Sequence, residues 1–213
     1  MKWARGKTGD GQVVTGVIEG ETLHPRAHLG SEAAAGDPMA LSELSLLPPV
    51  QPGKFIGLWN NFKAAAEKGG HAHPEHPLYF FKSDGSICGP GAEVALPEAA
   101  GRVLFEGELG IVIGQTCKDI TPEEARAAIL GLTCINDFTS LDILNADPSF
   151  PQWTRAKSFD GFGAVGPVIE TEIDWAAPLA LADQTEKPEP GRVVLKMENL
   201  QKHYEVAASA LFG

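Results

Sequence analysis

The sequence predicts a mostly β protein with a few helices, of the α+β class. Alternating apolar and polar residues in "QVVTGVIEG" (12–20) are typical of a half-buried strand. The β-branched, glycine-bounded stretch "VLFEGELGIVIG" (103–114) is typical of a strand in the core. With 213 residues, 43% of them hydrophobic, the chain is long enough to bury a substantial core.

Residues 1–46 are predicted to form a small N-terminal β domain. A Glu-Gly turn separates the strand at 12–20 from a second one in "ETLHP" (21–25). The stretch "LLPPVQPGK" (46–54) is a proline-rich connector, because proline lacks the N–H that a central strand requires. The remainder, residues 47–213, is predicted to form the second domain.

The second domain begins with short elements. "FIGLWN" (55–60) predicts a strand, and "NFKAAAEKGGHAHPEHP" (61–77) predicts an alanine-rich helical turn that ends at Gly69 and Gly70, followed by a His/Pro loop. "LYFFK" (78–82) predicts a return to extended structure.

The clearest helix signal is "TPEEARAAILGL" (121–132). Thr121 is a good N-cap, Pro122 suits the first helical position, and Glu124 completes a capping box. We expect this helix to end at Gly131 and "LTCIND" (132–137) to form the next strand. Beyond it, the chain is rich in loops up to a polar linker near residues 188–190 and a predicted hairpin at 192–206.

Two carboxylates in the strand at 103–114 need an explanation. Side chains alternate along a strand, so Glu106 and Glu108 point the same way, roughly 6–7 Å apart at about 3.3 Å per residue. The strand–helix–strand order can carry Asp137 back towards them. Three carboxylates form an all-oxygen set, which suits Mg²⁺, with Mn²⁺ or Ca²⁺ as substitutes. The alternative is a solvated polar face on an edge strand.

The composition limits which binding partners and which cellular compartment we expect. The formal net charge is −11 and no Lys/Arg cluster stands out, which argues against binding to nucleic acid or to a membrane surface. The three cysteines, Cys88, Cys117 and Cys134, give no disulfide framework, and we expect them to be reduced and mostly buried. No run approaches 18 apolar residues, so the prediction is a cytoplasmic protein.

Four blocks of sequence carry a resemblance to a known family. "LPPVQPGKFIGLWNNF", "FEGELGIVIG", "INDFTSLD" and "WTRAKSFDGFGAVGPVI" occur in the order and spacing of the fumarylacetoacetate hydrolase (FAH) superfamily. The resemblance runs from about residue 47 to 206. The N-terminal segment is similar to the small β domain of bacterial 2-hydroxyhepta-2,4-diene-1,7-dioate isomerases and related decarboxylases. The resemblance implies a β-rich catalytic fold over 47–213 and a homodimer.

The resemblance also implies roles for individual residues. The family's metal ligands fall on Glu106, Glu108 and Asp137, and its substrate-facing lysine falls on Lys157. The same reasoning makes Gln152 or Arg155 a candidate substrate contact, and we favour Gln152 because a structural role is as good an explanation for Arg155. A small 2-oxo or 2-hydroxydienoic acid would chelate the bound Mg²⁺ (or Mn²⁺). Lys157 would stabilise the negative charge on the enolate oxygen of that acid. The implied outcome is isomerisation or decarboxylation in the breakdown of aromatic compounds. The alternatives are C–C hydrolysis of an acylpyruvate or fumarylacetoacetate-type substrate, and a catalytically impaired metal-binding relative.

The chain departs from the family in its water-activating segment. Hydrolytic and decarboxylating members carry a histidine where this chain has Lys63, and a glutamate where it has Ala66. Lysine side chains are ordinarily protonated at neutral pH and do not act as bases. Lys63 therefore remains a candidate catalytic residue without an assigned base function. The loop with His71, His73 and His76 could supply a base if it closed over the site as a lid, and His71 with His73 also resembles half of a zinc site.

The second departure concerns the C-terminal part. Family members continue beyond the hairpin at 192–206 with a helix and a glycine-rich loop that closes the sheet, whereas this sequence stops at Gly213. We therefore expect a shortened catalytic domain with a sheet edge that needs cover.

Overall fold

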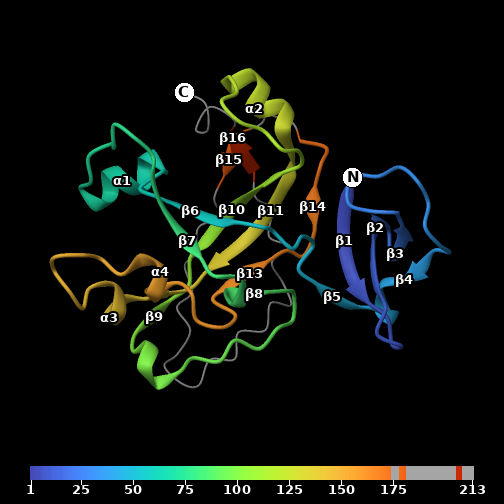
Figure 1. Ribbon diagram of the computed structural model, residues 1–213, viewed down its shortest axis with the longest axis horizontal. Coiled ribbons are helices and arrows are strands. Elements are labelled where there is room, and N and C mark those ends of the chain that lie inside the picture. Colours follow the sequence, from blue (N-terminus) through green and yellow to red (C-terminus); the bar gives the residue numbers. More distant parts are fainter. Residues whose placement is uncertain (174–177, 181–204, 208–213) are drawn as a thin grey trace.

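The computed structural model describes residues 1–173, 178–180 and 205–207, and it confirms a mostly β fold with short helices (Figure 1). The strands are β1 Lys2–Lys7, β2 Val13–Glu19, β3 Thr22–Pro25, β4 Met39–Ala40, β5 Ser45–Leu47, β6 Phe55–Trp59, β7 Leu78–Lys82, β8 Ile87–Cys88, β9 Val103–Leu104, β10 Gly107–Ile113, β11 Ile129–Asp137, β12 Thr139–Ser140, β13 Gly163–Val165, β14 Ile169–Glu170, β15 Pro178–Ala180 and β16 Glu205–Ala207. The helices are α1 Lys63–Gly69, α2 Pro122–Ala128, α3 Leu141–Leu144 and α4 Trp153–Ala156, with three single turns at Leu41–Glu43, Asp84–Ser86 and Glu98–Ala100.

A ten-stranded sheet forms the frame of the molecule. Its main path runs β4-β3-β2-β1-β14-β11-β13-β8, while β5 pairs with β1 and β10 pairs with β11. The predicted strands at 12–20 and 21–25 are confirmed as β2 and β3. Strand β1 pairs with β2 on one side and with β14 on the other, so the sheet continues across the predicted boundary at residue 46. The division into two domains stays a prediction.

The predicted strands and helical turn around the His/Pro loop are confirmed. β6 and β7 form a separate two-stranded sheet, joined by α1 and the loop after it. The helix ends where expected, because Gly70 adopts a left-handed conformation with φ of 69° and its N–H caps the last turn. In Figure 1, α1 lies on the opposite side of the molecule from β1–β4.

The capping box of α2 is confirmed, but its predicted end is wrong. The Thr121 side chain accepts a hydrogen bond from the Glu124 N–H, and the Glu124 carboxylate accepts one from the Thr121 N–H. The helix ends at Ala128, and Gly131 lies inside β11 instead. A Cβ on Gly131 would come within 2.4 Å of the Glu170 carbonyl oxygen, so glycine here serves a close strand contact.

The predicted strand at 103–114 is also corrected, because the structure divides it into β9 and β10. β9 pairs with β12, and β10 pairs with β11. Between them, the Glu106 N–H donates to the Asn136 side-chain oxygen instead of to a strand carbonyl. This break lies at the first of the two predicted site glutamates.

A hydrophobic cluster joins the N-terminal strands β1 and β2 to β10 and β14. Trp3 and Val17 pack against Val112 of β10 and Ile169 of β14, all of them buried. The predicted linker near 188–190 and nearly all of the predicted hairpin at 192–206 lie outside the described residues.

Candidate functional site

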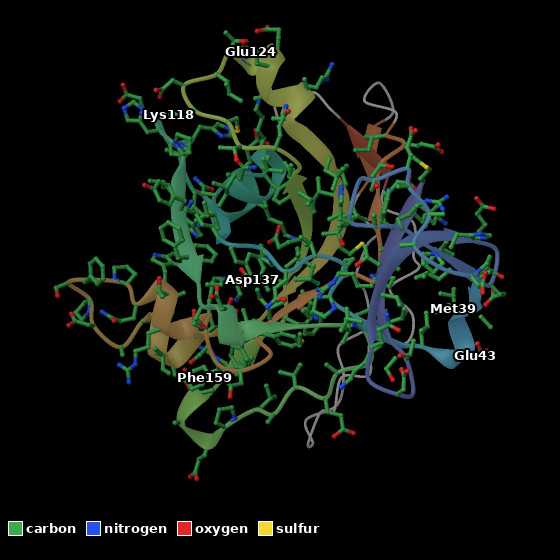
Figure 2. The ribbon with its side chains drawn as sticks, turned by 45° about the vertical axis from the view of Figure 1, so that its right-hand side comes forward. Met39, Glu43, Lys118, Glu124, Asp137 and Phe159 are labelled. Carbon is green, nitrogen blue, oxygen red and sulfur yellow. The ribbon has the colours of Figure 1, made fainter. Side chains whose placement is uncertain are left out.

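The centre of the site is the ammonium group of Lys157. Its side chain is 3% exposed, and Nζ lies 2.5 Å from Oε2 of Glu106 and 2.6 Å from Oδ2 of Asp137. Nζ also donates to Oγ1 of Thr139 at 2.6 Å, and that hydroxyl donates to Glu106 at 2.8 Å. Figure 2 shows Asp137 near the middle of the molecule, away from the peripheral Lys118 and Glu124.

The predicted return of Asp137 towards the two glutamates is confirmed, but antiparallel pairing of β10 with β11 brings it there and not a crossover between parallel strands. Asp137 is the last residue of β11, and its N–H donates to the Glu106 carbonyl at 2.8 Å. Glu108 lies in β10 opposite Ile135. The two neighbouring strands thus place all three predicted carboxylates at one end of the β10–β11 pair.

Lys82 is a member of the site that the sequence analysis missed. Its side chain is 1% exposed, and Nζ lies 2.6 Å from Oδ1 of Asp137 and also donates to the backbone carbonyl of Lys157. Burial lowers the pKa of Lys82, and the attraction of Asp137 opposes that shift. The available signal was strand alternation, which puts Lys82 on the same face of β7 as the buried Phe80.

Glu108 differs from the other two carboxylates. It has no hydrogen-bond or ion-pair partner among the described residues, whereas Glu106 and Asp137 both bind lysine. Burial raises its pKa to about 7, and the negative charges of Glu106 and Asp137 add to the effect. A cation beside Glu108 would favour its ionised form.

The donor set suits a hard divalent cation, although the carboxylates are not arranged as a ready-made metal site. Within the described part of the chain, no three His, Cys, Asp or Glu side chains are close enough to hold a metal ion as they stand. Glu106 and Asp137 are bridged instead by the Lys157 ammonium. Their oxygen donors fit Mg²⁺ or Mn²⁺ chemically, and so does the half-buried Glu108, which has no partner among the described residues. The ligand set stays a prediction.

Aromatic rings line one side of Lys157. Its Nζ lies 4.9 Å from the centre of the Phe80 ring and 6.0 Å from that of Trp153. The Phe80 and Trp153 rings stack at 5.6 Å, and Trp153 contacts Trp59, which in turn contacts His71. The rings therefore connect the ammonium group to the start of the His/Pro loop.

The structure does not bring Lys63 or Gln152 into this cluster. Lys63 is the exposed first residue of α1. Gln152 is half-buried directly before α4, and its amide donates to the Phe150 carbonyl. It lines an open pocket of about 630 Å³ whose other lining residues are Ser83, Ala99, Ile143, Thr154, Arg155, Ser158 and Phe159. The predicted roles of both residues remain untested.

Two further predictions concern the cysteines and the histidines. All three cysteines are free, but only Cys88 and Cys134 are half-buried and Cys117 is exposed, so the expectation that they are mostly buried is wrong. His71, His73 and His76 are exposed.

None of the described helices is long and apolar enough to cross a membrane.

Comparisons with solved structures match the fold. A 5-carboxymethyl-2-hydroxymuconate delta-isomerase from Mycobacterium smegmatis is 35% identical, with a TM-score of 0.73 over 83% of this chain and 69% of its own. A 2-hydroxyhepta-2,4-diene-1,7-dioate isomerase from Mycobacterium marinum is 34% identical, with a TM-score of 0.69 over 83% of this chain and 68% of its own. A maleylpyruvate hydrolase from Sphingobium sp. SYK-6, solved with manganese(II) and pyruvate, is 25% identical, with a TM-score of 0.60 over 83% of this chain and 70% of its own.

Comparisons of sequence alone also find related proteins. A relative from Archaeoglobus fulgidus is 36% identical over 171 residues, which are 80% of this chain and 65% of the relative. The chain thus spans somewhat less than two thirds of that protein. The family model described as "Fumarylacetoacetate (FAA) hydrolase C-terminal" matches residues 54–194, which include the whole lysine–carboxylate cluster. This chain belongs to the fumarylacetoacetate hydrolase family.

Proposed function

We propose that the protein is an enzyme that forms an enolate from a small 2-oxo or 2-hydroxydienoic acid, with isomerisation or decarboxylation as the outcome. The observation that carries the proposal is the buried Lys157 ammonium, held 2.5 and 2.6 Å from Glu106 and Asp137. A buried, fixed positive charge favours negative charge that develops on a neighbouring oxygen during a reaction. The isomerases among the similar structures support the same class of substrate.

The residues of the site have separate roles in this proposal. Glu106, Glu108 and Asp137 would hold Mg²⁺ or Mn²⁺, which supplies Lewis-acid polarisation of a chelated 2-oxo acid when it is bound. The Lys157 ammonium would lie beside the substrate oxygen, with the Phe80 and Trp153 rings excluding water from one side of it. Thr139, through its bonds to Lys157 and Glu106, would keep the ammonium oriented.

Hydrolysis of a C–C bond is the less supported outcome. It requires a base that activates water, and the candidate Lys63 is exposed on α1 and is not part of the cluster. Decarboxylation leaves its electron pair as an enolate and needs mainly stabilisation of that negative charge, which Lys157 can supply. Isomerisation also needs a group that moves a proton, and that group need not be the family histidine. We further propose the homodimer that the family resemblance implies, which analytical ultracentrifugation can check.

The test is a substrate panel with a matched lysine control. The protein is assayed with oxaloacetate and with acetylpyruvate, in Mg²⁺ or Mn²⁺ and in EDTA. We expect turnover of oxaloacetate that EDTA abolishes. Lys157→Met should lower the rate by roughly a hundredfold or more, on the scale of losing one electrostatic group in a reaction site. Lys118→Met, which changes a side chain that is 87% exposed, should leave the rate unchanged.

Four results would contradict the proposal. Turnover that persists in EDTA would show that the reaction does not need a metal. Turnover that survives Lys157→Met would show that it does not need the lysine. Hydrolysis of acetylpyruvate without decarboxylation of oxaloacetate would favour the hydrolase, and absence of all turnover would favour a catalytically impaired relative.

A further inference from the structure

Two Lys-Ser pairs, far apart in sequence, lie against each other next to the carboxylates. Lys82 is the last residue of β7 and Ser83 follows it, whereas Lys157 and Ser158 follow the short helix α4. The Ser83 N–H donates to Oγ of Ser158 at 2.9 Å, and Oγ of Ser83 donates to the Ser158 carbonyl at 3.2 Å. Lys82 adds a third link, because its ammonium donates to the Lys157 carbonyl.

The lysines and serines of these pairs face opposite ways. Both lysine side chains are almost fully buried and bind Asp137. Both serines line the open pocket of about 630 Å³, which none of the three carboxylates lines. The Ser83–Ser158 contacts therefore join the two backbones directly behind the lysines.

We propose that Ser158, with Ser83 as its partner, is a positioning residue that holds Lys157 in the carboxylate cluster. This inference rests on the proposed function only where it concerns reaction rate. Lys157 follows a helix of four residues, which is too short to fix a long side chain by itself. The Ser83–Ser158 contacts, and the Lys82 bond to the Lys157 carbonyl, fix the backbone from which the ammonium extends.

The first readout measures the placement of Lys157 independently of any enzymatic activity. The rate at which an amine-acylating reagent labels Lys157 at one fixed pH is followed by mass spectrometry in the wild type and in Ser158→Ala. A buried lysine is labelled only when its segment opens, and loss of one hydrogen bond makes such openings roughly two- to tenfold more frequent. We therefore expect labelling of Lys157 to be faster by about that factor, and Ser158→Thr, which keeps the hydroxyl, to restore the slow rate.

Ser86→Ala is the matched control. The Ser86 hydroxyl is buried and donates to the Ser83 carbonyl at 2.7 Å, so this variant loses one hydrogen bond in the same loop without touching residues 157 and 158. We expect it to leave the labelling of Lys157 at the wild-type rate. If Ser86→Ala accelerates labelling as much as Ser158→Ala does, the Ser83–Ser158 contacts have only a general structural role and the inference fails.

The second readout separates positioning from binding. Exchange of the pyruvate methyl protons with deuterated water, in Mg²⁺, reports enolate formation by nuclear magnetic resonance. With Ser158→Ala we expect the rate at saturating pyruvate to fall roughly two- to tenfold with an unchanged half-saturating concentration, because a less firmly held backbone displaces the ammonium from its best position in the closed state. A wild-type rate would overturn the inference for catalysis. Faster labelling of Lys157 in a protein that is inactive even as wild type would overturn the proposed function and leave the positioning intact.

Discussion

At the scale of single residues, the carboxylates of the site outnumber the ammonium groups beside them. Within the part of the chain that the structure describes, Glu106, Glu108 and Asp137 lie near two ammonium groups, those of Lys82 and Lys157. Asp137 divides its oxygens between the lysines, one for each. Glu108 receives no such partner within the described residues, and burial, together with the negative charges of Glu106 and Asp137, raises its pKa. The remaining negative charge marks the side of the cluster where a cation would bind most favourably.

This imbalance predicts a pH-dependent stability that belongs to Glu108. Its pKa rises from 4.5 to about 7 on folding, so the folded chain holds a proton that the unfolded chain has already released. The free energy of unfolding should therefore fall as the pH rises from 4.5 to 7 and level off above it. The loss is on the order of 1–2 kcal/mol after allowance for solvent screening of a partly exposed side chain.

Thermal unfolding in EDTA at pH 5, 6, 7 and 8 measures this effect. Glu108→Gln should flatten the profile and be more stable than the wild type at pH 8. Adding Mg²⁺ should stabilise the wild type more at pH 8 than at pH 5, because the cation binds the ionised carboxylate, and it should do little for the variant. A wild-type profile that the substitution leaves unchanged would show that Glu108 is not the titrating group.

At the scale of elements, local signals in the sequence predicted the starts of elements better than their contacts. Thr121 and Glu124 specify the start of α2 through bonds within four residues, so the sequence alone was sufficient there. Gly131 was taken for a helix end, because its real role, a close approach to β14, depends on a strand nearly 40 residues away. Lys82 was missed for the same reason: the partners that bury it, Asp137 and the Lys157 carbonyl, are 55 and 75 residues distant.

The corrected role of Gly131 gives a prediction about the β11–β14 contact. Gly131→Ala would bring a methyl group within 2.4 Å of the Glu170 carbonyl oxygen and 2.5 Å of the Ile169 side chain, so the strands must separate. We expect a loss of about 1–3 kcal/mol in the free energy of unfolding, as for other overpacked sites. Urea unfolding measures it. Gly9→Ala is the control, because a methyl group there meets no atom within 4 Å; equal effects of the two substitutions would refute the close-contact explanation.

At the scale of the whole molecule, one sheet connects the N-terminal strands to the strands of the site. Trp3 pairs with Ile169 across the β1–β14 contact, and the same two side chains pack with Val17 and Val112. Val112 lies on β10, the strand that carries Glu108. The core next to residues 1–46 is thus shared with the strand that positions a site carboxylate. Sequence composition suggested a boundary at residue 46, because the proline-rich connector is visible locally and the β1–β14 pairing is not.

Replacing Trp3 tests whether the predicted N-terminal domain is energetically separate. Its side chain is 3% exposed at the junction, so Trp3→Ala should cost about 3–5 kcal/mol. If residues 1–46 and 47–173 unfold as one unit, urea unfolding followed by circular dichroism should show a single transition that moves as a whole, and Trp3→Phe should recover part of the loss. Phe150→Ala removes an aromatic ring that is 66% exposed and should change stability by less than about 0.5 kcal/mol. Two transitions, of which only the weaker responds to Trp3→Ala, would instead establish an independent N-terminal domain and make the boundary at residue 46 real.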